Sequence, residues 1–181
     1  ERVEDIKSGW PSITKCGAGE ILASHGSGAK EGINIYKREV AGQGEWRFIK
    51  NLPEATWPRI ITSGENGQYV HIIGGDQDED NTLVNYVYYY RSTDYGETWS
   101  DATVPVNQDY YNYMIGADDY IMAANGDNVA IMFASINCDI FYLISHDNGE
   151  NWETVTICQQ PHANQDGSGH MFDWNWNTTY N

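Results

Sequence analysis

Short stretches of alternating apolar and polar residues make up most of the chain, and turns rich in Gly and Asn separate them. The stretch 68–73, Q-Y-V-H-I-I, has the two-residue period of a strand with one buried face. Tyr, Val and Ile dominate these stretches, and β-branched and aromatic residues favour strands. Because no stretch shows a convincing helical period, the pattern predicts an all-β protein.

The predicted strands fall into three units of four strands each. They cover 12–16, 20–25, 32–39 and 45–50 in the first unit, 59–63, 68–73, 85–91 and 98–104 in the second, and 120–124, 128–135, 138–145 and 151–158 in the third. The connection between the second and third strands varies most in length between units. Insertions in one loop of a repeated unit are typical of a stacked or radial array.

Two aromatic residues recur through these units at a fixed distance of 53 residues. They are Trp46, Trp99 and Trp152, and Tyr36, Tyr89 and Tyr142. Four strands in about 50 residues is the size of a propeller blade. We therefore predict a β-propeller with blades at about 9–53, 54–106 and 114–160, and with 161–181 as the start of a further blade or a tail.

An octet with the pattern S-x-D-x-G-x-x-W occurs twice, at 92–99 and 145–152, between the third and fourth strands of its unit. A tight turn there needs Gly for positive φ, while Asp and Ser can accept and donate hydrogen bonds within the turn. The indole can pack beneath the turn and seal the outer corner of the blade. The pattern thus predicts a structural role for Ser92, Asp94, Gly96, Trp99, Ser145, Asp147, Gly149 and Trp152.

This octet resembles the Asp-box, or BNR repeat, of sialidase-like β-propellers. In the first unit the same register reads E-V-A-G-Q-G-E-W at 39–46, with Ala41 in place of Asp, so this copy is degenerate. The resemblance implies a six- or seven-bladed propeller, of which three blades and part of a fourth are expected here, completed by the remainder of a longer polypeptide or by a partner chain. It indicates fold more than activity, because the boxes of the family lie on the propeller rim.

Sialidases of this family use an arginine triad, a Tyr nucleophile paired with a Glu, and an Asp acid/base. Arg59 is the one arginine expected on an innermost strand, and W-P-R-I at 57–60 departs from the family's F-R-I-P-type motif. We therefore predict a non-catalytic propeller segment that binds carbohydrate or protein. One alternative is part of a sialidase-like glycoside hydrolase whose catalytic residues lie partly outside this segment. The other is an exported cargo protein bound to a secretion complex.

The formal charge of −16, from 26 acidic and 10 basic residues, argues against a nucleic-acid partner. No run approaches the roughly 18 apolar residues of a membrane-spanning helix. An acidic surface of this kind suits a secreted or cell-surface protein, and the Asp-box resemblance suggests a bacterial one. Acidity for solubility alone is the simpler interpretation.

Several further residues are candidates for ligand contacts. Exposed aromatic rings can stack on sugars, and the candidates are Tyr110, Tyr111, Tyr113, Trp174 and Trp176, although tyrosines of this kind also pack between blades. Alternating Asp side chains could hold a calcium ion, although a solvated hairpin tip is the alternative, and these are Asp76, Asp78 and Asp80. The sequence requires no other cofactor.

Cys138 and Cys158 lie symmetrically about Asn148, the centre of the second octet. In a regular hairpin they would face each other, so a disulfide and a pair of buried thiols are both open. Cys16 would remain free.

Overall fold

The computed structural model describes residues 9–25, 32–76, 83–84, 86–105, 115–135 and 140–158. In these ranges the chain is all-β, with three antiparallel sheets and a single 3-10 turn, η1 (Glu65–Gly67). We call the sheets blades 1, 2 and 3. The predicted β-propeller fold is confirmed.

Blade 1 has four strands in sequence order, and blade 2 has three. The strands of blade 1 are β1 (Gly9–Cys16), β2 (Gly19–His25), β3 (Ile33–Arg38) and β4 (Arg47–Leu52). Those of blade 2 are β5 (Thr56–Ser63), β6 (Tyr69–Gly75) and β8 (Val87–Ser92). Blade 3 has five strands in the order β12-β11-β10-β9-β7, namely β12 (Glu153–Cys158), β11 (Ile140–Ser145), β10 (Asn128–Ser135), β9 (Ile115–Asn125) and β7 (Leu83–Val84).

The predicted outer strand of blade 2, residues 98–104, does not form a regular strand. This segment runs beside β8 but forms only one isolated bridge, between Tyr89 and Thr103. The ladder is interrupted at Arg91, whose N–H donates to the Ser100 side chain at 3.0 Å instead of to a carbonyl. Blade 3 has a fifth strand at its inner edge, because β7, from the long insertion after β6, pairs with the start of β9.

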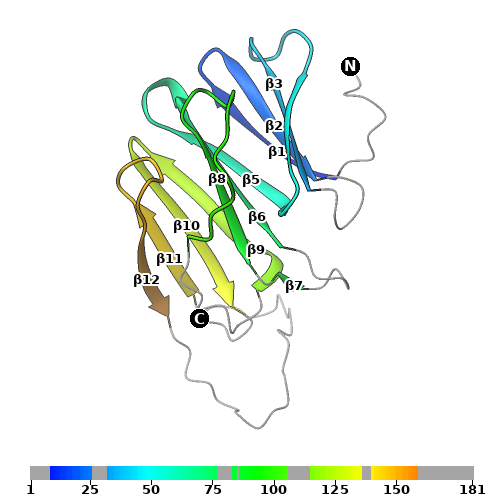
Figure 1. Ribbon diagram of the computed structural model, residues 1–181. Coiled ribbons are helices and arrows are strands. Elements are labelled where there is room, and N and C mark those ends of the chain that lie inside the picture. The colour runs from blue at the N-terminus through cyan, green and yellow to red at the C-terminus, as the bar shows by residue number, and fades with distance from the viewer. Residues whose placement is uncertain are drawn as a thin grey trace, which may run out of the picture.

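The three blades lie side by side, with β5 packed between β1 and β9 (Figure 1). Successive side chains of β6 and β8 point to opposite faces of blade 2, as the pleat of a strand requires. Val70, Ile72 and Tyr90 are buried against blade 1, and Ile73, Val87 and Tyr89 are buried against blade 3. The core is therefore a pair of apolar layers between neighbouring blades.

Candidate functional site

The octet of blade 2 is a closed hydrogen-bonded turn. The Ser92 hydroxyl donates to Asp94 Oδ1 at 2.8 Å and accepts from the Gly96 N–H at 2.8 Å. Asp94 Oδ1 also accepts from the N–H groups of Glu97 and Thr98, at 3.1 and 2.9 Å. Partial burial alone would raise the pKa of Asp94, but these donors, together with the Thr98 hydroxyl, outweigh it and lower that pKa.

The octet of blade 3 repeats this geometry. The Ser145 hydroxyl donates to Asp147 Oδ1 at 2.7 Å and accepts from the Gly149 N–H at 2.8 Å. The N–H groups of Glu150 and Asn151 donate to Asp147 Oδ1 at 3.1 and 2.9 Å. Hydrogen bonds from the Asn151 backbone and side chain lower the pKa of Asp147. Two different sequences thus form one and the same turn.

Each octet packs on the preceding blade. A Cβ at Gly149 would lie 1.8 Å from the Tyr89 hydroxyl of blade 2, and a Cβ at Gly96 would lie 2.2 Å from Ile21 Cδ1 of blade 1. The Trp152 ring meets the Tyr89 ring edge to face, with centroids 5.1 Å apart. Trp99 likewise packs against the core layer between blades 1 and 2. The indoles therefore seal the seams between blades, and not only the corner of their own blade as the sequence suggested.

Blade 1 has a different corner. In blades 2 and 3 the octet serine pairs across the sheet with a valine, as in Ser92 with Val70 and Ser145 with Val129. In blade 1 the same place holds Arg38 paired with Glu20. The Glu20 carboxylate forms an ion pair with Arg38 and accepts from the Gly42 N–H at 3.1 Å. The Arg38 guanidinium in turn lies 4.6 Å from the centre of the Trp46 ring.

This corner is one residue longer than an octet, since Trp46 follows Arg38 by eight residues and Trp99 follows Ser92 by seven. Tyr36 is therefore equivalent to Tyr90, two residues before the start of the corner, and not to Tyr89. The 53-residue spacing therefore aligns Tyr36 with the wrong tyrosine of blade 2. The alignment is off by one position because the corner of blade 1 contains one extra residue between the tyrosine and the tryptophan.

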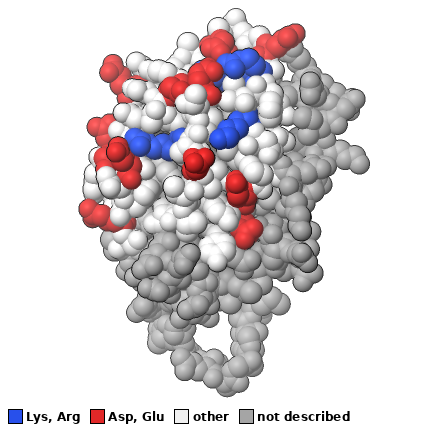
Figure 2. Space-filling view, in the orientation of Figure 1, with Lys and Arg blue, Asp and Glu red and all other residues white. Residues whose placement is uncertain are grey.

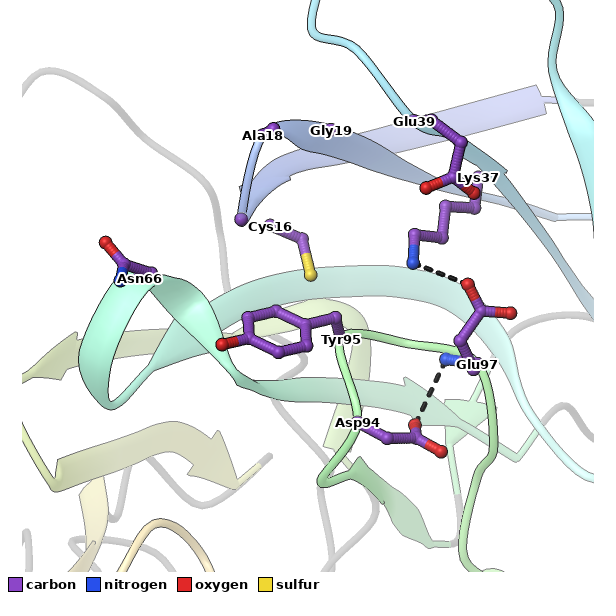
Figure 3. A pocket seen from close by; sticks show the side chains of 10 residues that line it. Cys16, Ala18, Gly19, Lys37, Glu39, Asn66, Asp94, Tyr95 and Glu97 are labelled. Carbon is purple, nitrogen blue, oxygen red and sulfur yellow. Dashed lines mark hydrogen bonds and ion pairs between the residues drawn. The ribbon is translucent and has the colours of Figure 1, made fainter.

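A pocket of about 650 Å³ lies where the octet of blade 2 meets blade 1 (Figure 3). On its wall Lys37 Nζ and Glu97 Oε1 form an ion pair at 2.6 Å, and Arg47 also bonds Glu97. Burial raises the pKa of Cys16 to about 11, so its thiol stays protonated. Tyr95 covers the thiol from the octet side (Figure 3).

A buried polar chain crosses the seam between blades 2 and 3. The Ser63 hydroxyl donates to Asn148 Oδ1 at 2.7 Å, so its oxygen accepts from His71 Nε2–H at 2.7 Å. His71 Nδ1 is then the acceptor for the Tyr89 hydroxyl, also at 2.7 Å. Asn148 continues the chain to Asp127 at 3.1 Å. Burial, followed by the nearby charge of Arg91, lowers the pKa of His71 to about 3, so the ring is neutral.

At the opposite end of the blades, a Trp-Pro pair with the same backbone conformation occurs in both blade 1 and blade 2. Trp10 and Trp57 each precede a proline at the start of an inner strand, and each has left-handed backbone, with φ 46° and 48°. The register of the inner strand shifts at both places, as at a β-bulge. Trp57 is 6% exposed, whereas Trp10 is 55% exposed. Their rings meet edge to face at 6.4 Å, and His25 lies beside both.

Arg59 lies two residues beyond Trp57 on β5. Its guanidinium is 5.8 Å from the centre of the Tyr120 ring on β9, and its Nη1 donates to the Pro58 carbonyl at 3.3 Å. The Tyr120 hydroxyl donates to the Trp57 carbonyl at 2.6 Å. This end of the inner strands thus brings together indole, phenol and guanidinium. The sequence singled out Arg59 but missed Trp10, although its repetition in W-P-S-I and W-P-R-I was visible.

Other predicted site residues lie outside the described parts of the chain. These are Tyr110, Tyr111, Tyr113, Trp174, Trp176, Asp78, Asp80 and Cys138. Asp76 follows β6, where its N–H donates to the Tyr86 carbonyl at 2.7 Å. Where the structure describes side chains, no three His, Cys, Asp or Glu residues gather as metal ligands. The calcium site stays a prediction.

The backbone of Cys158 pairs with Ile140, because the hairpin of β11 and β12 carries a register shift between Ile140 and Phe141. Positions equally far from Asn148 are therefore not paired at this end of the hairpin, although the sequence suggested a disulfide on that basis. The Cys138–Cys158 bond itself stays a prediction.

No helix within the described ranges is long and apolar enough to span a membrane. The face shown in Figure 2 carries acidic side chains around a small group of basic ones. Among the described residues, Lys37 and Arg47 pair with Glu97, and Arg38 pairs with Glu20, so several basic groups are used within the protein.

No family model and no curated protein sequence matches this chain. Solved structures do. An α-L-arabinofuranosidase from Fusarium graminearum, in complex with an iminosugar inhibitor, is 11% identical, with a TM-score of 0.57 over 93% of this chain and 51% of that one. An α-L-arabinanase from Penicillium chrysogenum, complexed with arabinobiose, is 14% identical, with a TM-score of 0.55 over 87% and 52%.

The sialidase of Trypanosoma rangeli is 14% identical, with a TM-score of 0.51 over 83% of this chain and 30% of that one. At these identities the likeness establishes the propeller fold. The chain spans about half the length of the arabinofuranosidase and arabinanase that it matches.

Proposed function

We propose that this chain is a carbohydrate-binding, non-catalytic region of an Asp-box β-propeller in a secreted or cell-surface protein. The ligand contacts the inner-strand starts around Trp10, Trp57 and Arg59. The observation that carries this proposal is the unequal exposure of the two tryptophans, which share one backbone conformation.

A bulky residue with positive φ is uncommon and strained, by about 1–3 kcal/mol. For Trp57 the burial of its indole between blades 2 and 3 offsets that strain. Trp10 carries the same strain but leaves over half of its surface in water. Bulges of this type often re-aim a side chain beside a binding site, which accounts for an indole held rigidly outward.

The chemistry of this end suits a sugar. An exposed indole offers a flat apolar surface to the C–H face of a sugar ring, while Arg59 supplies hydrogen-bond donors for hydroxyl or carboxylate oxygens. Structures of the same fold hold arabinobiose and an iminosugar inhibitor. Hydrolysis of a glycosidic bond commonly uses two carboxylates, and of the inner strands β1 and β5 contain no Asp or Glu while β9 contains Asp118 and Asp119. Arg59 is the one arginine on these three inner strands, which favours binding over the arginine triad of a sialidase.

The experiment is a titration of the chain with arabino-oligosaccharides and sialosides, followed by tryptophan fluorescence and calorimetry. We expect saturable binding that Trp10→Ala weakens at least tenfold with the unfolding midpoint nearly unchanged. The control is Tyr95→Ala, which removes another exposed aromatic ring at the far end of the blades. Equal loss in both variants, or no sugar bound by the wild type, would refute the proposal.

The alternative is part of a sialidase-like glycoside hydrolase, favoured by the fold shared with the sialidase. Turnover of a fluorogenic sialoside or arabinoside, abolished by Arg59→Ala, would establish it and reject the non-catalytic function.

A further inference from the structure

Blade 1 turns one apolar face away from blade 2. Ile13 and Phe48 on this face are 54% and 53% exposed, and Val40 at its corner is 49% exposed. Tyr36 lies beneath Phe48, with ring centroids 5.6 Å apart. No other described sheet covers these side chains. Large exposed apolar groups gathered on one sheet face mark an interaction surface.

The same positions are buried in blade 2. Ile60 takes the place of Ile13 in the inner strand and is 5% exposed, and Tyr90 takes the place of Tyr36 and is 1% exposed. Both pack against blade 1. The free face of blade 1 is therefore patterned as a blade-to-blade seam that no described blade occupies.

Blade 3 offers the complementary face. Tyr142 is equivalent to Tyr89, since each lies three residues before the serine of its octet. Tyr89 receives the indole of Trp152 at the seam between blades 2 and 3. Tyr142 is partly exposed on the side of blade 3 that points away from blade 2, and it could receive Trp46 in the same way.

The charges at the two faces also match. At each existing seam a basic residue just before the corner meets an octet glutamate: Lys37 with Glu97 and Arg91 with Glu150. On the free face of blade 3 the basic position is Ile144, and on blade 1 the glutamate position is Gln43, the fifth residue after Arg38. Both partners of the ion pair are replaced together. The two free faces thus leave neither half of this ion pair without its partner.

We infer that two copies of this chain associate through these faces, with blade 1 of each copy against blade 3 of the other, and close a ring of six blades. A contact between two different faces produces a closed ring when the rotation from one copy to the next brings the chain back to the first copy. A ring of six blades lies within the range of known propellers. The chain spans about half the length of two matching propeller enzymes, as this assembly requires. The inference does not depend on sugar binding.

The test is sedimentation velocity on the whole chain from about 1 to 100 μM. We expect a dimer that Phe48→Glu and Tyr142→Glu each convert to monomer, with circular dichroism showing that both variants remain folded. The matched control is Tyr95→Glu, because Tyr95 is also an exposed large side chain, at 38%, but lies in the octet of blade 2 beside Gly17 of blade 1, outside both free faces. A second variant of the same face, Ile13→Glu, is available if Phe48→Glu does not fold.

Mixing the two monomeric variants gives the decisive result. A dimer of one Phe48→Glu copy with one Tyr142→Glu copy contains one seam without any substitution, so the mixture should recover dimer that neither variant forms alone. A wild type that is monomeric at 100 μM, a mixture without recovery, or dissociation by Tyr95→Glu would each overturn the inference. Open-ended polymers in place of dimers would do the same.

Discussion

The corners of blades 3 and 1 do the same work with different residues. In blade 3 the carboxylate that holds the turn belongs to the turn itself, where Asp147 accepts two backbone N–H bonds. In blade 1 the carboxylate comes from the neighbouring strand, where Glu20 accepts from the Gly42 N–H. A corner needs an acceptor for its inward N–H groups, and either source meets that need.

The difference lies in what each corner faces. The blade 3 corner presses Gly149 and Trp152 onto Tyr89 of blade 2, so its shape is fixed by the partner surface. The blade 1 corner faces no described blade, and a Cβ at Gly42 would meet nothing within 4 Å. The octet is thus best understood as a seam-forming device, and it degenerates where the contact it serves is different or absent.

The largest loss of stability should come from adding a methyl group at Gly149, where the octet of blade 3 lies closest to blade 2. Gly149→Ala would place a methyl group 1.8 Å from the Tyr89 hydroxyl and force φ near +81° on an L residue. We expect the free energy of unfolding to fall by about 3 kcal/mol, from overpacking and backbone strain together. Urea unfolding measures it.

Gly42→Ala is the matched control in the other corner. Its φ of +74° carries the same strain without any steric clash, so we expect a loss of only about 1 kcal/mol. Equal losses in the two variants would mean that the octet turn is not shaped by the neighbouring blade.

The repeat in the sequence was enough to predict the fold but not the partners of the repeated residues. Trp99 and Trp152 marked the corners, yet the sequence could not show that an indole packs on the preceding blade, because that contact depends on the angle between sheets. Residues 98–104 have strand composition, and the Ser100 side chain interrupts their ladder. Trp10 was missed because exposure, and not residue type, distinguishes it from Trp57.

The seam between blades 2 and 3 should also be sensitive to acid, through His71. The pKa of His71 is about 3 in the folded protein, against 6.5 for an unperturbed histidine, so the unfolded chain binds the proton first as pH falls. Stability is therefore complete above about pH 6.5 and is lost toward pH 3, by up to about 1.4 kcal/mol per pH unit. At pH 5 we expect a loss of about 2 kcal/mol.

Urea midpoints at pH 7, 6 and 5 measure this dependence, since most carboxylates titrate below that window. The variant His71→Gln should be less stable at pH 7 but should show a flatter profile. A wild-type profile as flat as that of the variant would contradict a neutral, buried His71.

The smallest expected change in stability distinguishes a corner whose carboxylate belongs to its own turn from one whose carboxylate comes from the neighbouring strand. Asp94→Ala removes the acceptor of the Ser92 hydroxyl and of two backbone N–H groups, so we expect a loss of about 1.5 kcal/mol in thermal or urea unfolding. Asp94→Asn should lose less, because its amide oxygen still accepts those bonds. Glu20→Ala removes one backbone bond and a partly buried ion pair, and we expect a smaller loss that added salt reduces further. If Glu20→Ala were as damaging as Asp94→Ala, the carboxylate of the blade 1 corner would be a full equivalent of the octet aspartate and the corner would not be degenerate.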